Sequence, residues 1–160
     1  MALLYLCASI VETMATKLVI GSDHAGYALK EKVKQFISNH FELDIHDVGT
    51  YSEESTDYPD YAHEAANLVA ADLDNTIGVL ICGSGNGISM AANKHADIRC
   101  ALSWLPEIAE LARLHNNANI VSLPARFISE EMVFEIVKTF LTTPFEGGRH
   151  ERRVNKIACV

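Results

Sequence analysis

The stretch Ile77-Gly78-Val79-Leu80-Ile81-Cys82-Gly83-Ser84-Gly85-Asn86-Gly87-Ile88 decides the fold class. Its first half is almost entirely apolar, which is typical of a central parallel strand covered on both faces. Its glycine-rich second half predicts a turn, and apolar residues at helical spacing follow in Ile88–Lys94. A buried strand that turns directly into a helix indicates a parallel α/β sheet.

The same alternation of strand and helix recurs along the rest of the chain. The predicted strands are Lys17–Ser22, Leu43–Val48, Ile77–Cys82, Arg99–Ser103 and Asn119–Leu123. The predicted helices are Tyr27–Ser38, Pro59–Asp72, Ile88–Lys94, Pro106–Leu114 and Glu130–Leu141, with a short helix after Gly147-Gly148 and an N-cap at Ser129. This order predicts a single-domain, three-layer, doubly wound (Rossmann-like) α/β fold with a five-stranded parallel sheet.

The N-terminus and the cysteines bear on localisation. Met1–Val11 is apolar, but no Lys or Arg precedes it and it is too short to span a bilayer. We therefore expect residues 1–15 to be a flexible extension and residues 16–160 to be the domain. The four cysteines show no Cys-x-x-Cys pair and no metal-ligand spacing, which predicts a reducing, cytoplasmic compartment and argues against structural zinc. They are Cys7, Cys82, Cys100 and Cys159.

The charge distribution indicates a small anionic ligand. The 160 residues are 49% hydrophobic and carry a net charge of −8, which disfavours nucleic acid and anionic membranes as partners. All six arginines nevertheless lie at or after residue 99, and the guanidinium group suits bidentate anion binding. They are Arg99, Arg113, Arg126, Arg149, Arg152 and Arg153.

The Cys82–Gly87 turn is the sharpest candidate for chemistry, because ligands of doubly wound sheets bind beyond the carboxyl ends of strands. Its three alternating glycines would let backbone N–H groups converge on an oxyanion. The spacing matches neither the dinucleotide fingerprint nor the Walker A loop. Donors at this turn would favour the thiolate of Cys82, which could then act as a base. The structural alternative for Cys82 is a small apolar plug at the strand end.

Three further groups have both a functional and a structural interpretation. Asp23-His24 follows the first strand, where an Asp is also a common helix cap. His115 ends a helix, where a histidine can simply act as a cap. Arg149 and Arg153 would share one helix face and could hold a phosphate, or could form a solvated basic tail. The other histidines are interpreted as surface residues: His40, His46, His63 and His95.

Five motifs in register resemble the type B ribose-5-phosphate isomerases, a group that also includes galactose-6-phosphate and allose-6-phosphate isomerases. The resemblance covers residues 17–157. The motifs are Val19–Gly26, Thr56-Asp57-Tyr58-Pro59, Leu80–Lys94, His115-Asn116 and Gly147-Gly148-Arg149-His150.

This resemblance implies an enzyme without cofactor or metal that interconverts ribose 5-phosphate and ribulose 5-phosphate, a pentose phosphate pathway step, through a cis-enediolate. Cys82 would be the base at C2 and C1, and His115, helped by Asp23, would open the sugar ring. Ser84 and the loop Gly83, Gly85, Asn86 and Gly87 would stabilise the enediolate oxygen, while Tyr58 and Asn116 would position the substrate. The implied phosphate ligands are His24, Arg126, Arg149 and Arg153, with weaker claims for Arg113, Arg152 and His150.

The resemblance also implies a homodimer, or a tetramer, whose active sites combine two subunits. Either the C-terminal arginines or His115-Asn116 would cross that interface. Two alternatives stay open. The substrate could be allose 6-phosphate or galactose 6-phosphate, or the chain could be a non-catalytic module that binds a phosphosugar or a nucleotide.

Overall fold

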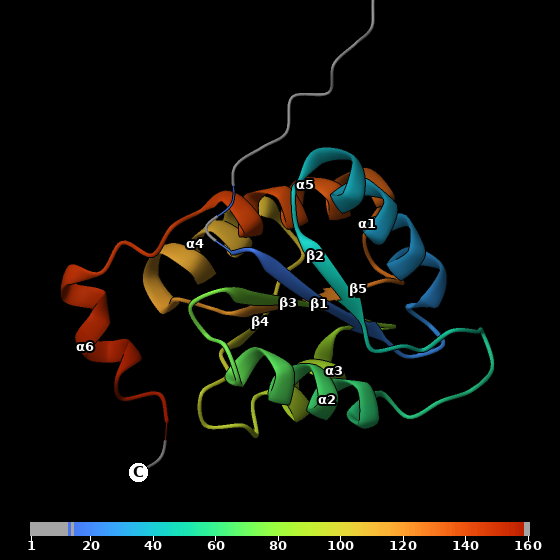
Figure 1. The fold of residues 1–160 in the computed structure, drawn as a ribbon, viewed down its shortest axis with the longest axis horizontal. Helices are drawn as coiled ribbons and strands as arrows, with labels where there is room; N and C mark the ends of the chain where they lie inside the picture. The colour runs from blue at the N-terminus through green and yellow to red at the C-terminus, as the bar shows by residue number, and fades with distance from the viewer. Residues whose placement is uncertain (1–12, 14, 159–160) are drawn as a thin grey trace, which may run out of the picture.

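The computed structural model describes residue 13 and residues 15–158 (Figure 1). The predicted N-terminal extension, Cys7 and Cys159 therefore lie outside the described residues, apart from positions 13 and 15 of the extension. Within the described residues, no helix has the length and apolar character needed to cross a bilayer.

Five parallel strands form one sheet, which confirms the predicted fold class. The strands are β1 (Lys17–Ser22), β2 (Asp44–Asp47), β3 (Thr76–Cys82), β4 (Cys100–Leu102) and β5 (Ile120–Pro124), and their order in the sheet is β2-β1-β3-β5-β4. The fully buried β3 lies at the centre, as its apolar sequence predicts. Because the chain runs outward from β1 to β2 and later from β3 to the other edge, the crevice for a ligand lies between the ends of β1 and β3.

Helices cover both faces of the sheet (Figure 1). One face packs on α1 (Tyr27–His40), α4 (Pro106–Asn116) and α5 (Glu130–Thr142), and the other on α2 (Tyr58–Ala70) and α3 (Asn86–Ala92). Alternate strand residues supply two cores: Leu18 and Ile20 belong to the first, whereas Val19 belongs to the second. The three-layer prediction is therefore confirmed.

The C-terminal segment differs from the single short helix that the sequence predicts. It forms a 3₁₀ turn, η1 (Gly148–His150), followed by one α-helical turn, α6 (Glu151–Val154). In Figure 1 this red segment lies beside α4, at one side of the body. Gly147 and Gly148 both adopt positive φ angles, 70° and 54°, so the chain turns sharply into η1.

Most other predicted boundaries hold to within two residues, and the differences have local causes. The helix predicted from Ile88 begins at Asn86, because Gly85 adopts a left-handed conformation (φ 74°) directly before it. The helix predicted to end at Leu114 continues to Asn116 and stops at Asn117, which is also left-handed (φ 46°). The predicted strand Arg99–Ser103 shortens to β4, and the Arg99 N–H bonds the Asn119 side chain instead.

Candidate active site

A cavity of about 350 Å³ lies beyond the carboxyl ends of β1, β3 and β5, and it brings together much of the predicted site. These three strands are neighbours in the sheet, so residues far apart in sequence meet there. The cavity is lined by Asp23, His24, Ala25, Tyr58, Cys82, Gly83, Ser84, Gly87, Arg126 and Phe127. Within it, the residue types supply a thiol, a carboxylate, an imidazole and a guanidinium.

Cys82 is the last residue of β3 and is held on two sides. Its Sγ accepts a hydrogen bond from the Gly85 N–H at 3.2 Å, and its carbonyl oxygen accepts one from the Ala125 N–H at 3.0 Å. The Gly85 amide is therefore directed at the sulfur, so the thiol and the backbone of the glycine loop face each other at the strand end. Cys82 is only 4% exposed, yet it lines the cavity. It therefore borders both the core and the ligand space.

Cys100, the first residue of the edge strand β4, offers a chemical contrast to Cys82. It is buried in the second core, and burial raises the pKa of its thiol to about 12. A thiol with that pKa stays protonated at neutral pH and cannot act as a base. Position at the strand end therefore distinguishes the two cysteines.

Asp23 and His24 follow β1 and contact different partners. The N-cap of α1 is Gly26, and the Asp23 carboxylate accepts the Gly26 N–H at 3.1 Å in the turn before the helix while it also lines the cavity. The Thr56 N–H lies 3.2 Å from Nδ1 of His24. Nδ1 also lies 3.3 Å from the Thr56 carbonyl oxygen, so both backbone groups of Thr56 engage this ring nitrogen. Nε2 makes neither contact, and when it carries a proton it can donate a hydrogen bond to an anion.

Tyr58 is the first residue of α2 and lies against the first turn of α3. A Cβ atom built on Gly87 would be 2.6 Å from Tyr58 Cζ, so the absence of a side chain at Gly87 is what admits the tyrosine ring. Tyr58 is 39% exposed and lines the cavity. A glycine in this loop therefore has a packing role as well as a conformational one.

Arg126 brings a cation to the glycine loop. Its guanidinium lies over Gly83, where a Cβ would be 3.3 Å from Cζ, and its backbone N–H donates to the Gly83 carbonyl at 3.0 Å. The next residue, Phe127, is 74% exposed and lines the same cavity. Sequence reasoning missed Phe127; its position just after β5, at the edge where ligands bind, was the available signal.

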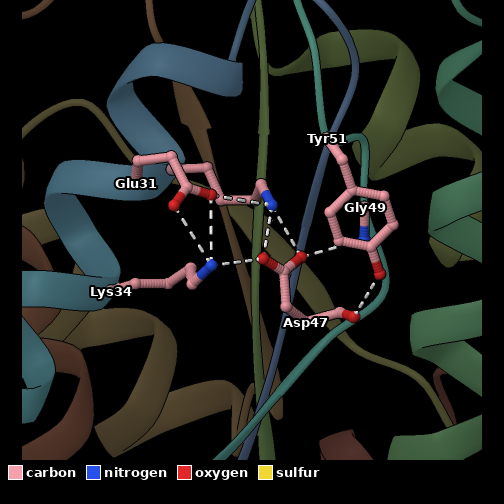
Figure 2. A network of polar contacts seen from close by, with 6 residues as sticks. Glu31, Lys34, Asp47, Gly49 and Tyr51 are labelled. Atoms are coloured by element: carbon pink, nitrogen blue, oxygen red, sulfur yellow. Dashed lines mark hydrogen bonds and ion pairs between the residues drawn. The ribbon is translucent and has the colours of Figure 1, made fainter.

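A partly buried ion-pair network supports the loop between β2 and α2 (Figure 2). The fully buried Lys30 donates to both carboxylate oxygens of Asp47 at 2.6 and 2.5 Å, and Lys34 donates to the same carboxylate at 2.6 Å. Asp47 in turn accepts the Gly49 N–H at 2.9 Å, and its carbonyl accepts the Tyr51 hydroxyl at 2.8 Å. The network therefore anchors the start of the segment that leads to Tyr58.

The charges in this network shift each other's pKa values. Burial raises the pKa of Asp47, but hydrogen bonds from Lys30, Lys34 and the Gly49 N–H outweigh it and leave this pKa below its usual value. Burial by itself lowers the pKa of Lys34, but the hydrogen bonds and charges of Asp47 and Glu31 raise it by more. The net shift of this pKa is therefore upward. Sequence reasoning missed these residues. Lys30 lies three residues before the buried Val33 on the apolar face of α1, which was the available signal.

Gly85 and Asn86 follow the lining residue Ser84 at the start of α3, whereas the other four predicted site residues lie away from the cavity. His115 and Asn116 end α4, and a helix that follows the carboxyl end of one parallel strand returns to the amino end of the next. Arg149 and Arg153 lie in η1 and α6, which pack beside α4. Within one chain, the predicted site is therefore separated into two halves, one at the carboxyl ends and the other at the amino ends of the strands.

His115 has close neighbours at the amino ends of the strands. Its ring stacks on His150 with centroids 4.1 Å apart and planes inclined by 6°. The Glu146 carboxylate lies 3.7 Å from Nε2 of each of the two histidines. Burial, followed by the charges of His115, Arg149 and Arg153, lowers the pKa of His150 despite the opposing effect of Glu146.

Arg113 and Arg99 line a larger cavity of about 430 Å³ at the amino ends of the strands. Arg113 Nε donates to the Thr143 carbonyl at 3.1 Å, and Arg99 Nε donates to the Asn117 carbonyl at 2.8 Å. Arg113 thus lies away from the Cys82 cavity of its own chain, as His115 and the C-terminal arginines do, and its role as a phosphate ligand stays a prediction.

The histidines interpreted as surface residues need a partial correction. His46 and His63 are exposed, but His40 and His95 are half-buried. His40 stacks on Phe36, and His95 Nε2 lies 2.9 Å from Nδ1 of His63. The His40–Phe36 contact joins residues four apart on α1, whereas the His63–His95 contact joins residues distant in sequence and depends on tertiary packing.

Comparison with known proteins identifies close relatives. The ribose/galactose isomerase family matches residues 18–157. A putative sugar phosphate isomerase of Rickettsia conorii is 44% identical over 140 residues, which covers 88% of this chain and 96% of that protein. Ribose-5-phosphate isomerase B of Escherichia coli is 40% identical over 145 residues, covering 90% of this chain and 95% of that protein.

Solved structures agree with the sequence matches. A ribose 5-phosphate isomerase from Thermotoga maritima is 52% identical, with a TM-score of 0.86, and the match covers 91% of this chain and 99% of that one. Ribose-5-phosphate isomerase B from Mycoplasma genitalium, crystallised with bound ribulose 5-phosphate, is 40% identical with a TM-score of 0.85, covering 90% of this chain and 95% of that one.

Proposed function

Because the chain belongs to the ribose/galactose isomerase family, we propose that it is an enzyme that interconverts ribose 5-phosphate and ribulose 5-phosphate. The Escherichia coli relative carries that name, and the Mycoplasma genitalium relative was crystallised with bound ribulose 5-phosphate. One observation carries the proposal for this chain. Cys82 ends the central strand inside a cavity that also holds an acid, an imidazole and a cation.

The chemistry follows from where these groups lie. Cys82 thiolate would take the proton from C2, so that the C–H electron pair forms the C1–C2 double bond of a cis-enediolate and the C1 carbonyl pair moves to the C1 oxygen. The thiol would then return the proton to C1, while the C2 hydroxyl gives its proton to the C1 oxygen and becomes the carbonyl. Ser84 and the donors of the glycine loop would stabilise the charge that develops on oxygen, which is where fixed donors lower the barrier most. The step needs no cofactor, because one base can serve both carbons.

Phosphate binding is assigned to the rim of the cavity. His24 can donate through Nε2, and Arg126 lies over Gly83 with its guanidinium beside the same space. A guanidinium and an imidazole N–H together suit a phosphate dianion. Arg149 and Arg153 would complete this set from the other half of the site.

Ring opening requires the second half, and we propose that a partner copy supplies it. Cys82 lies at the carboxyl ends of the strands. The amino ends of the strands carry His115, Asn116 and the C-terminal arginines, which therefore cannot reach the cavity of their own chain. In a homodimer with two-fold symmetry, the surface of each copy that carries His115 and the C-terminal arginines can face the Cys82 cavity of the other copy. Both predicted groups would then cross the interface, and a tetramer would pair such dimers.

A substrate panel tests the proposal most directly. Turnover of ribose 5-phosphate, allose 6-phosphate and galactose 6-phosphate by the purified protein is measured in excess chelator. We expect the highest kcat/KM with ribose 5-phosphate and undiminished activity with chelator. Binding without turnover of any of the three would contradict the proposal and favour a binding module. A reducing, cytoplasmic compartment is part of the proposal, because the reaction needs Cys82 as a free thiol.

A further inference from the structure

The cavity of about 430 Å³ at the amino ends of the strands is a second candidate binding site. It shares no lining residue with the cavity that holds Cys82. Thr76 and Ile77, which begin β3, form part of its wall, and its volume lies in the range of small-molecule sites. A ligand bound here would therefore not compete for the space beside Cys82.

Two arginines meet in this cavity through one residue, Asn117. Arg99 Nε donates to the Asn117 carbonyl at 2.8 Å, and Arg113 Nη1 donates to Asn117 Oδ1 at 3.4 Å. Both arginines are half-buried. Burial, followed by the charge of Arg99, lowers the pKa of Arg113. Two like charges held this close repel each other, so an anion that contacts both would relieve the repulsion.

Each guanidinium keeps donors for a ligand. Arg113 directs Nε to the Thr143 carbonyl and Nη1 to the Ala118 carbonyl, while Arg99 uses Nε and Nη1 in the same way. Within the described part of the chain, Nη2 of neither arginine makes a hydrogen bond. No described carboxylate lies within 4.0 Å of either guanidinium. The two charges are therefore available to an anion from solution.

The rest of the lining suits an anion that carries an apolar group. Among the described lining residues, Asp74 is the single acid, so the two arginines leave an excess of positive charge. Asp74 is exposed at the rim of the cavity. Ile77, Leu141 and Phe145 supply apolar surface beside the arginines.

We propose that this cavity binds a small organic oxyanion, a phosphate or a carboxylate attached to an apolar group. Arg99 and Arg113 hold the oxyanion by donating through Nη2, and the apolar group lies against Leu141 and Phe145. Guanidinium groups form charge-assisted hydrogen bonds with both kinds of oxyanion. The site goes beyond the proposed isomerase function and does not depend on it.

Phenyl phosphate is the probe, because it joins an oxyanion to an apolar ring. Its binding to the full chain is followed by ¹⁵N–¹H NMR, which locates the site without turnover. We expect shifts of the amide signals of Asn117–Asn119. Inorganic phosphate lacks the ring and benzyl alcohol lacks the charge, so each should bind at least about 10-fold more weakly at this site. Tighter binding of benzoate than of phenyl phosphate would support the carboxylate form of the proposal.

Two variants change the charge of the cavity in opposite directions. Arg99→Gln should weaken the binding of phenyl phosphate at least about 10-fold. Asp74→Asn removes a negative charge from the lining, so binding should tighten, and misfolding cannot produce such a gain. Glu64→Gln is the matched control, because Glu64 is an exposed acid of α2 outside the lining, and its affinity should equal that of the wild type.

Three results would overturn the site. They are shifts confined to the Gly83–Gly87 loop, equal affinity for benzyl alcohol and phenyl phosphate, and unaltered binding in both Arg99→Gln and Asp74→Asn. A protein that binds phenyl phosphate at Asn117–Asn119 but isomerises no sugar would instead contradict the proposed function and leave this site standing.

Discussion

At the scale of single residues, chemistry depends on where a side chain lies relative to the strand ends. Cys82 and Cys100 are both buried free cysteines of one sheet. Cys82 ends its strand, receives the Gly85 N–H and lines a cavity, whereas Cys100 begins its strand inside a core that raises its thiol pKa to about 12. The same functional group is therefore a candidate base in one place and an inert apolar residue in the other.

Alkylation should distinguish the two thiols. Iodoacetamide at neutral pH should modify Cys82, with loss of activity and with protection by substrate, and should leave Cys100 unmodified in the folded protein. Peptide mass mapping locates the label. In kinetics, Cys82→Ala should lower kcat by about 10²–10⁴-fold, the range for removal of an acid–base group, whereas Cys100→Ala should not. A fully active Cys82→Ala variant would remove this residue from catalysis.

Gly87→Ala tests packing at the cavity. The new Cβ would fall 2.6 Å from Tyr58 Cζ, so the exposed tyrosine ring must move. Gly87 does not adopt a positive φ and lies in α3, so alanine suits its backbone. We expect KM for ribose 5-phosphate to rise several-fold with little change in melting temperature. An unchanged KM would contradict the role of Tyr58 in positioning substrate.

At the scale of elements, a buried charge couples α1 to the end of β2. Lys30 has no exposed surface, and Asp47 meets both Lys30 and Lys34 while also bonding the Gly49 N–H (Figure 2). A buried ammonium without its carboxylate is strongly unfavourable. This pair therefore determines how firmly the loop toward Tyr58 is held.

Asp47→Asn should destabilise the fold by about 3 kcal/mol at neutral pH, because it leaves the buried Lys30 with only the more exposed Glu31 carboxylate, 3.2 Å away. The pKa of Asp47 is lowered in the fold, so its contribution is complete above its unfolded value near 4 and is lost as pH falls through the lower folded value. The difference between variant and wild type in urea unfolding should thus shrink below about pH 4. Asp72→Asn, at the more exposed Lys17–Asp72 pair, is the control and should change stability little. Equal effects of the two substitutions would contradict this account.

At the scale of the whole molecule, the fold divides the predicted site between the two ends of the parallel strands. The cavity at the carboxyl ends holds Cys82, while His115 and the C-terminal arginines lie at the amino ends. Helix α4 connects the carboxyl end of β4 to the amino end of β5, so no side-chain movement can bring His115 to Cys82 within one chain. Association of two copies is the simplest arrangement that unites them.

Mixing two inactive variants tests this arrangement. Cys82→Ala and His115→Ala are refolded together, so that mixed dimers form at random. If each site takes Cys82 from one copy and His115 from the other, each mixed dimer contains one intact site, and the mixture should recover about a quarter of wild-type activity. Each variant refolded alone is the control and should stay inactive. No recovery from a mixture that contains mixed dimers would contradict a shared site.

The sequence by itself determined the local features of this protein. The apolar run ending at Cys82 predicted a central strand, and Ser129 predicted an N-cap that the structure places 3.3 Å from the Met132 N–H. These features depend on residues a few positions apart, so pattern and turn chemistry suffice to find them. Tertiary structure alone decided that Lys30 is buried against Asp47 and that His115 lies opposite to Cys82. Both depend on strand order and on which surfaces lose water when distant segments pack, and no local pattern contains that information.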